Sequence, residues 1–239
     1  MVGPPVDGSL RPLDGGSTGV RFRGRLPALL FSRLLWANEP VLLRGHADHT
    51  WTLQTSLERA RFRGDEYVER WRRAAEQFLA RLEKEPAVRR AYAGNIPDHH
   101  REAILQHYGF PTELLNVTYS YDVALYFAEG GTDDLVDGGR NLGCLYAFPT
   151  WVISSAPYTL APGIMRPALQ RGVFVKGVGP RERTSLERFR LVFQHFDMPV
   201  WNGLSNIPFG SPVGLGKYLF PLSDPLEFLA ADIRAPLKD

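Results

Sequence analysis

The stretch LQHYGFPTELLNVTYSYDVALYFA, residues 105–128, decides more of the fold than any other part of the 239-residue chain. It begins inside a predicted helix, Asp98–Tyr108, which Gly109 and Pro111 end because neither residue continues a helix well. It finishes in the apolar run Tyr121–Ala128, which predicts another helix. The stretch therefore spans the end of one predicted helix and the whole of another.

The pentapeptide TSLER occurs twice, at residues 55–59 and 184–188. Each copy has the capping-box form, in which a threonine hydroxyl and a glutamate carboxylate satisfy the first backbone N–H groups of a helix. The first copy predicts a short helix, and the second predicts a helix over Leu186–Phe196. We interpret the repetition as the same helix-start chemistry used twice rather than as a duplication.

The rest of the chain mixes helices with strands. Asp65–Glu85 has a long apolar face and predicts a helix that Pro86 ends. One more helix and three buried strands are predicted, at Leu26–Ala37 and at Val41–Leu43, Gly143–Phe148 and Gly172–Val175. Because helices and strands do not alternate regularly, the pattern favours an α+β fold over a doubly wound one.

Composition and the ends of the chain set the expected organisation. Residues 1–20 are rich in Gly, Pro and Ser and predict a flexible tail, so residues 21–239 are expected to form a single α+β domain. The one cysteine, Cys144, excludes an internal disulfide framework and lies in an apolar stretch, where we interpret it as a core residue. No signal sequence is recognisable, and the most apolar window, 26–43, is interrupted by charges and a proline. We expect a cytoplasmic protein without a membrane partner.

Basic residues are unevenly distributed although the net charge is only +2. The segment 21–101 holds 16 Lys/Arg against 10 Asp/Glu. This excess could form a basic face for nucleic acid, or belong to a solvated helix surface laced with Glu–Arg pairs, which is the commoner outcome for a charge run. Five aromatic residues could stack on bases if exposed, although core packing is their default role: Trp51, Trp71, Tyr119, Tyr121 and Tyr126.

Three blocks resemble, in order, the FRG family, which is named for a Phe/Tyr-Arg-Gly tripeptide. They are LLRGHADHTWTLQTSLER (42–59), the stretch 105–128 and RPALQRGVF (166–174), and YLFPLSDPLEFL (218–229) is a weaker echo of the family's closing stretch. Phe-Arg-Gly also occurs at 22–24 and 62–64, but only Arg44-Gly45 is followed by the expected Trp and Ser-Leu. The chain departs from the family pattern at three places: Leu43 replaces an aromatic residue, Glu113 an arginine, and Asn116-Val117 an Asp-Trp pair.

The order of these blocks is similar to that of ADP-ribosyltransferases of the arginine/serine/glutamate branch. The resemblance implies an ADP-ribosyltransferase-like core, a split mixed/antiparallel sheet with packed helices. The counterparts would be Leu43-Arg44-Gly45, Thr118-Tyr119-Ser120 before the helix 123–128, the strand Cys144–Phe148, and Gln170–Phe174 as the last strand. It also implies NAD as the cofactor.

The implied site assigns a role to six residues. Arg44 would hold the NAD phosphates through forked hydrogen bonds, and Gly45 would let the backbone approach the dinucleotide. Further cofactor contacts would come from Thr118 and His107, and the catalytic positions would be Ser120 and Gln170. Gln170 stands where the relatives carry a glutamate, so an amide replaces the carboxylate that stabilises the oxocarbenium-like ribose. Glu113 could supply a carboxylate from another direction.

Five of these six residues also have a purely structural interpretation. Arg44 could pair with Asp48, Thr118 and Ser120 could cap a helix, and Gln170 could be satisfied within the sheet. His107 could be a helix C-terminal residue stabilised by the helix dipole.

No metal site is predicted, because His46 and His49 are too few ligands and the run Asp98-His99-His100 cannot aim three side chains at one ion. The leading hypothesis is an NAD-dependent mono-ADP-ribosyltransferase, a bacterial toxin or antiphage effector acting on nucleic acid or protein. The alternative is a non-catalytic FRG module that binds a nucleotide or a macromolecular partner. A nuclease is disfavoured, since no acidic cluster for paired metal ions is visible.

Overall fold

The computed structural model describes residues 20–22, 32, 39–128, 142–153, 157–160, 165–176, 179, 183, 185–194 and 224–237. Most of the predicted N-terminal tail and of the predicted helix Leu26–Ala37 lies outside these residues. The chain divides into two compact units. Unit 1 consists of Met1–Thr52, Tyr119–Val152 and Gly179–Gly216, and unit 2 of Leu53–Thr118, Ile153–Val178 and Lys217–Asp239.

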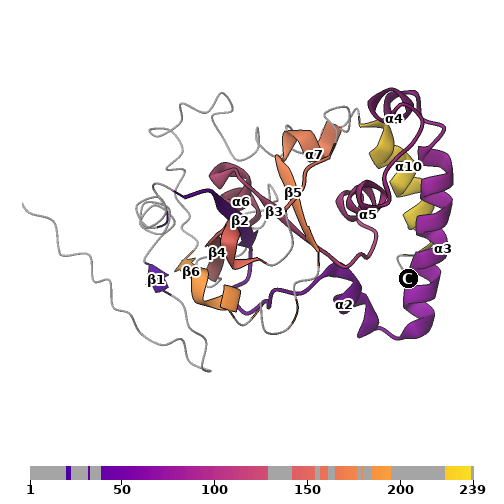
Figure 1. The fold of residues 1–239 in the computed structure, drawn as a ribbon. Helices are drawn as coiled ribbons and strands as arrows, with labels where there is room; N and C mark the ends of the chain where they lie inside the picture. Colours follow the sequence, from indigo (N-terminus) through magenta and orange to yellow (C-terminus); the bar gives the residue numbers. More distant parts are fainter. Residues whose placement is uncertain are drawn as a thin grey trace, which may run out of the picture. The chain divides into compact units, whose positions relative to one another are not determined.

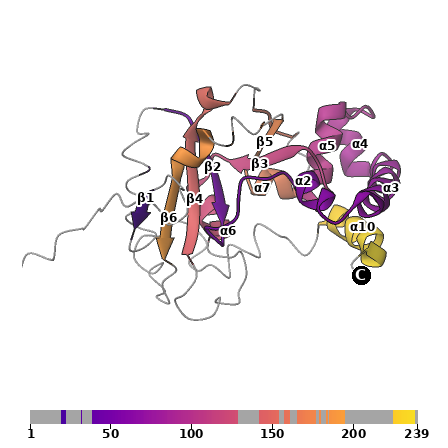
Figure 2. The same cartoon turned by 90° about the horizontal axis from the view of Figure 1, so that it is seen from below.

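Unit 1 is built on a sheet in which β1 pairs with β6, β6 with β4, and β4 with β2 (Figure 2). The β6–β4 and β4–β2 pairs are antiparallel, and β1 runs parallel to β6. The strands are β1 (Val20–Phe22), β2 (Val41–His46), β4 (Leu142–Pro149) and β6 (Arg190–Gln194), and two 3-10 turns, η1 (Thr150–Val152) and η2 (Glu187–Phe189), accompany them.

One face of this sheet is covered by the helix α6 (Tyr121–Ala128). Side chains alternate between the two faces of a strand, so every second residue of β2, β4 and β6 points toward the helix. The residues that pack together on this side are all buried and apolar: Val41, Leu43, Ala124, Leu125, Ala128, Leu145, Ala147 and Leu191. The opposite face carries the polar residues described below.

Unit 2 combines a two-stranded antiparallel pair with a set of helices (Figure 1). The strands are β3 (Leu114–Thr118) and β5 (Gly172–Lys176). The helices are α2 (Ser56–Arg61), α3 (Asp65–Leu82), α4 (Pro86–Tyr92), α5 (Asp98–His107), α7 (Met165–Leu169) and α10 (Pro225–Arg234), followed by the 3-10 turn η4 (Ala235–Leu237).

The core of unit 2 forms around α3. Its apolar face, including Phe78 and Leu82, packs against Tyr108, Phe110 and α10. Phe78 is fully buried, and its ring lies 4.9 Å from that of Phe110. Burial of a phenylalanine of this kind stabilises the fold by about 1.5–3 kcal/mol. The helix ends at Leu82 rather than at the predicted Glu85, and Pro86 starts α4 instead of only ending α3, because the first turn of a helix does not need its N–H.

The short helix predicted from the first TSLER copy is confirmed. The Thr55 hydroxyl accepts a hydrogen bond from the Glu58 backbone N–H, and the Glu58 carboxylate accepts one from the Thr55 N–H, which completes a capping box in front of α2. The predicted helices at 98–108 and 121–128 and the three predicted strands are also found, with ends shifted by at most a few residues.

The helix predicted from the second TSLER copy, Leu186–Phe196, is wrong over residues 190–194, and residues 195–196 lie outside the described residues. Ser185 and Leu186 are helical, but the 3-10 turn η2 follows them, and residues 190–194 become the strand β6. The Glu187 carboxylate accepts a hydrogen bond from the Tyr146 hydroxyl, and the edge of β4 provides backbone partners for β6. Tertiary pairing therefore overrides the local helix signal, as short apolar segments allow.

The fold class is confirmed as α+β. The antiparallel pairs of both units and the lack of regular alternation agree with the prediction, and the parallel β1–β6 pair makes the sheet of unit 1 mixed.

Candidate functional site

Arg44 lies on the face of β2 that is turned away from α6. Its register partner is Tyr146 on β4, and the register partner of Tyr146 is Arg190 on β6. Directly opposed residues of antiparallel strands point to the same face, so these three side chains form one row across three strands. Together with His46 and Glu187 we call them the Arg44 cluster.

His46 holds the guanidinium of Arg44. The Nε of Arg44 donates a hydrogen bond of 2.8 Å to the Nε2 of His46. An imidazole nitrogen that accepts a hydrogen bond carries no proton, so the proton of neutral His46 lies on Nδ1, which is 3.3 Å from the carbonyl oxygen of Trp51. His46 is 5% exposed, and its ring meets that of Tyr146 edge-on at 5.3 Å. The arginine is thereby fixed through one of its five donors.

The second half of the cluster is an ion pair at the start of β6. The Nη1 of Arg190 lies 3.4 Å from a carboxylate oxygen of Glu187 and donates a 2.9 Å hydrogen bond to the carbonyl oxygen of His49. The Tyr146 hydroxyl lies 3.0 and 3.1 Å from the two oxygens of the same carboxylate. Burial, Cys144 and Glu187 raise the pKa of Tyr146 far above its usual value, so the phenol remains a hydrogen-bond donor.

Cys144 is a core residue, as predicted. It is completely buried on β4, and burial raises the pKa of its thiol to about 12. A thiol in this state is a poor nucleophile because its thiolate is not populated near neutral pH.

Gly45 has a packing role in addition to the one expected for it. A side-chain carbon at this position would collide with the carbonyl oxygen of Ala124 and the backbone nitrogen of Ala128. The glycine therefore lets β2 lie directly against the backbone of α6. The Ser120 hydroxyl, at the start of the same helix, is 3.4 Å from the Val123 nitrogen, in the position of a weak cap.

In unit 2, Thr118 and Gln170 lie together. The Thr118 hydroxyl donates a 3.0 Å hydrogen bond to the backbone carbonyl of Gln170. The resemblance placed Gln170 at the start of a strand Gln170–Phe174, and the structure corrects this. The strand β5 begins at Gly172, and Arg171 between them has a φ of 47°. Gln170 is buried, with 4% exposure, in the turn between α7 and β5.

His107 is buried at the end of α5. Its ring packs edge-on against Phe174 at 5.0 Å, and a side-chain carbon at Gly172 would collide with its Nε2. This nitrogen is buried and has no hydrogen-bond partner among the described residues. Burial, followed by the charge of Arg166, lowers the pKa of His107 to about 3, so the ring is neutral. Arg166 donates to the carbonyl oxygen of His107 and pairs with Glu227 at 2.8 Å.

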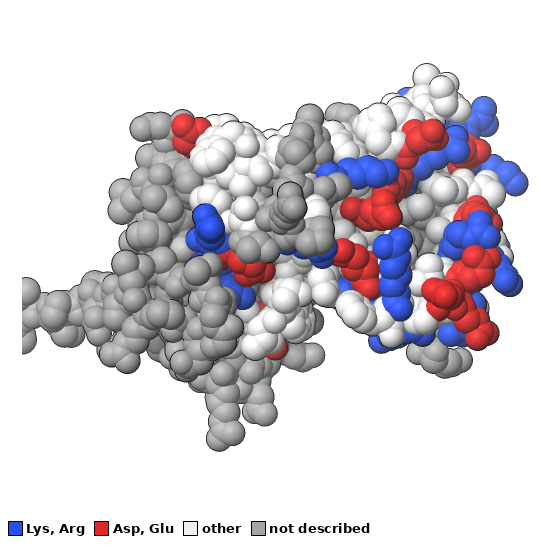
Figure 3. All heavy atoms as spheres, turned by 60° about the horizontal axis from the view of Figure 1, so that its bottom comes forward, with Lys and Arg blue, Asp and Glu red and all other residues white. Residues whose placement is uncertain are grey.

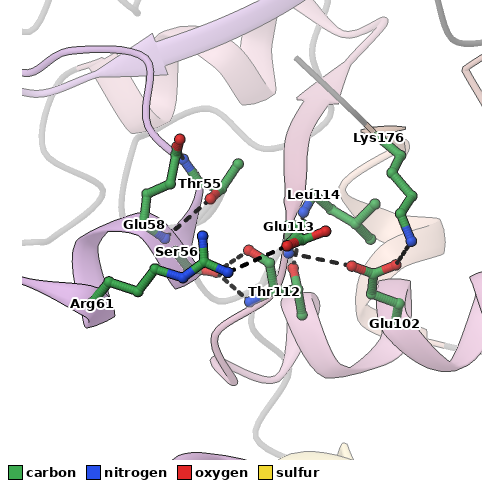
Figure 4. A network of polar contacts seen from close by, with 9 residues as sticks. All are labelled: Thr55, Ser56, Glu58, Arg61, Glu102, Thr112, Glu113, Leu114 and Lys176. Atoms are coloured by element: carbon green, nitrogen blue, oxygen red, sulfur yellow. Dashed lines mark hydrogen bonds and ion pairs between the residues drawn. The ribbon is translucent and has the colours of Figure 1, made fainter. Parts of the chain in front are cut away.

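The remaining motif residues of unit 2 form a connection that we call the motif joint: Ser56, Gln106 and Thr112 (Figure 4 draws two of them). The Gln106 side-chain oxygen accepts hydrogen bonds from both the Ser56 and the Thr112 hydroxyls. The Ser56 hydroxyl also accepts from the Thr112 N–H. The first and second sequence blocks therefore meet through hydrogen bonds that explain these residues structurally.

Glu113, which replaces a family arginine, lies beside the motif joint. Its carboxylate is 3.5 Å from Arg61 on α2, and its backbone N–H donates to Glu102, which also pairs with Lys176 at 3.0 Å (Figure 4). Its side chain is 55% exposed. These contacts give Glu113 a place in a surface charge network.

The arginines of α3 belong to a paired surface. Arg72 lies 2.8 Å from Glu69 and 2.6 Å from Glu76, and Arg73 also pairs with Glu69. Hydrogen bonds from Arg72 and then Arg73 lower the pKa of Glu69 to about 2. In Figure 3 acidic and basic side chains are interspersed. The interpretation as a Glu–Arg-laced helix surface accounts for this part of the basic excess.

Of the five aromatic residues considered for base stacking, two are well exposed, Trp51 at 56% and Tyr119 at 46%. Tyr126 is buried, and Trp71 and Tyr121 pack against the cores of their units. Within the described ranges, no group of three or more His, Cys, Asp or Glu side chains could hold a metal ion. Among the helices that the structure describes, none is long and apolar enough to cross a membrane.

The predicted site residues thus fall into two groups. Arg44, Gly45 and Ser120 belong to unit 1, whereas His107, Thr118 and Gln170 belong to unit 2. Their convergence on one cleft stays a prediction. The residues that hold Arg44 and share its face were not predicted: His46, Tyr146, Glu187 and Arg190. Arg190 was not singled out because its segment was predicted to be helical. In the structure, pairing of β6 with β4 places Arg190 in the same row as Arg44.

Residues 39–134 match the model of the FRG domain. The predicted resemblance to the FRG family is confirmed for this segment, which contains the first two blocks, whereas the third block and the closing stretch lie beyond it. No curated protein and no solved structure gives a significant match to the chain.

Proposed function

We propose that the protein binds NAD and transfers its ADP-ribose group to a nucleic acid or a protein, with Arg44 holding the pyrophosphate. The observation that carries the proposal is the arrangement of Arg44 near the end of β2, with its Nε bound to the Nε2 of His46. A guanidinium fixed at its Nε keeps a defined orientation. A planar fork of this kind suits phosphate oxygens better than a lysine ammonium does.

The order of elements also supports this proposal. The strand with Arg44-Gly45, the Thr118-Tyr119-Ser120 segment, the helix α6 and the strands β4 and β5 follow one another as the resemblance to ADP-ribosyltransferases implies. In the reaction, the bond from the ribose to nicotinamide breaks, positive charge develops on the ribose, and the acceptor then bonds to the same carbon. The amide of Gln170 could hydrogen-bond a ribose hydroxyl but would contribute no charge to this step.

A non-catalytic FRG module that binds a nucleotide is the second candidate. The observation that favours it is the turn Gln170-Arg171-Gly172, which carries no carboxylate where the transferases have one. Such a module would retain Arg44 as an anion ligand and lose only the chemical step.

Two measurements on the purified chain separate these functions: release of nicotinamide from NAD, with and without nucleic acid, and calorimetric binding of ADP-ribose. The transferase predicts both signals, and the module predicts binding alone. Absence of both would refute the proposed NAD site.

The role of Arg44 is tested by Arg44→Ala, Arg44→Lys and the control Arg188→Ala, which removes an exposed arginine of the same unit. Loss of a charge-assisted contact costs about 1.5–3 kcal/mol, so Arg44→Ala should weaken ADP-ribose binding at least about tenfold. Arg44→Lys should not restore it, because an ammonium cannot form the fork. A lowered melting temperature with unchanged binding would instead make Arg44 a structural residue.

A further inference from the structure

Arg190 is placed to share a ligand with Arg44. Both residues are register neighbours of Tyr146, one on each side of it, and all three point to the sheet face opposite α6. Adjacent strands lie about 4.8 Å apart, so the two arginine Cα atoms are roughly 10 Å apart. Two arginine side chains on one face can reach a common ligand across the tyrosine that separates them.

The hydrogen bonding of Arg190 is incomplete. The residue is 6% exposed, and its Nη1 binds the His49 carbonyl oxygen and lies 3.4 Å from Glu187. Its Nε is buried and donates to no atom in the part of the chain that the structure describes. The Glu187 carboxylate is shared with the Tyr146 hydroxyl, which lies closer to it than Arg190 does. A buried cation with an unused donor is costly unless a partner completes it.

Cys144 shows that both arginines act on the same region of this face. Burial is the main cause of the raised pKa of its thiol, and among the charges near it Arg190 and Arg44 both favour the thiolate whereas Glu187 and Asp48 oppose it. The Asp48 carboxylate is engaged in a turn, where it accepts hydrogen bonds from the Thr50 N–H and hydroxyl. The two positive charges are therefore close enough to influence one buried group together.

We infer that Arg190 and Arg44 together form the binding site for a diphosphate, with Arg190 taking the second phosphate through its Nε. The inference rests on the proposed function and adds Arg190 as a second residue that binds the pyrophosphate, which makes the site select a nucleoside diphosphate over a monophosphate. A diphosphate diester carries two negative charges, one for each guanidinium. Glu187 acts as a positioning residue, because its carboxylate lies 3.4 Å from the Nη1 of Arg190 and accepts a hydrogen bond from the Tyr146 hydroxyl.

The comparison of ADP-ribose with AMP tests the second arm directly. Calorimetric affinities are measured for the wild-type chain, Arg190→Ala, Glu187→Gln and the control Arg188→Ala, whose exposed side chain lies on η2 next to Glu187. Arg190→Ala should weaken ADP-ribose binding by about tenfold or more and AMP binding by much less. Glu187→Gln removes the carboxylate that positions Arg190 and should weaken ADP-ribose binding by less than Arg190→Ala does, and Arg188→Ala should change neither affinity.

Arg190→Lys carries the test if the alanine variant does not fold, since it retains the buried positive charge but not the Nε donor. It should also weaken ADP-ribose binding by about tenfold. If either folded variant binds ADP-ribose within twofold of the wild type while Arg44→Ala loses binding, Arg190 is only structural and the proposed function stands. If the wild-type chain binds no ADP-ribose, the proposed function fails and the second arm fails with it.

Discussion

The Arg44 cluster of unit 1 and the motif joint of unit 2 both include residues from the sequence blocks that mark the FRG resemblance, yet they use polar groups differently. In the motif joint, Gln106 accepts from two hydroxyls that also bind backbone groups, so each polar atom has a local structural purpose. In the Arg44 cluster, two arginines from different strands lie on one face of the sheet, and the Nε of Arg190 is buried and donates to no atom within the described part of the chain. A specific motif can therefore mark a folding element as readily as a binding site.

Two glycines of the sequence blocks, Gly45 in unit 1 and Gly172 in unit 2, test the comparison through the stability of the fold. Gly45→Ala is expected to have the largest effect. The added carbon would collide with backbone atoms of Ala124 and Ala128, which can move only if α6 leaves the sheet. We expect destabilisation by about 3 kcal/mol or more, at the upper end of overpacking costs. Urea denaturation measures it. Gly179→Ala, where an added carbon meets nothing within 4 Å, is the control and should be near neutral.

Gly172→Ala should have a smaller effect, because the obstacle is a side chain. The added carbon would collide with the His107 ring, which Phe174 holds from another side. We expect a loss of about 1–3 kcal/mol in the same denaturation experiment. The double variant Gly172→Ala/His107→Ala should regain part of that loss relative to the sum of the single variants. Strict additivity of the two changes would contradict the contact.

The neutral His107 ring predicts a pH dependence of the stability of the fold. In the unfolded chain this histidine takes up a proton below pH 6.5, whereas in the native chain its pKa is about 3. The unfolded state thus binds more protons between these values, so stability falls as the pH is lowered through this window, by up to about 1.4 kcal/mol per pH unit. His107→Gln should flatten the profile of unfolding free energy between about pH 6.5 and 4. Parallel profiles for variant and wild type would show that the ring is not buried as described.

The sequence predicts a helix or a strand correctly where neighbouring residues determine whether that element forms. The capping box at Thr55, the helix 121–128 and the strand at Val41 depend on neighbouring residues, and each was found. The helix predicted from the same letters at 184–188 does not continue, because the edge of β4 and the Tyr146 hydroxyl, both distant in sequence, determine the structure of residues 187–194. Strand register is likewise nonlocal. For that reason Arg44 could be singled out from its motif, whereas Arg190 and its place beside Tyr146 could not.

The burial of Cys144 also gives the protein a built-in reporter. The chain has one cysteine, and it lies on the central strand of the β2–β4–β6 arrangement with a pKa of about 12. A thiol-specific reagent can react with it only when that sheet opens, since a buried thiol is both inaccessible and unionised. Its labelling rate therefore measures the opening of unit 1 alone, whereas changes in unit 2 are silent unless the two open as one.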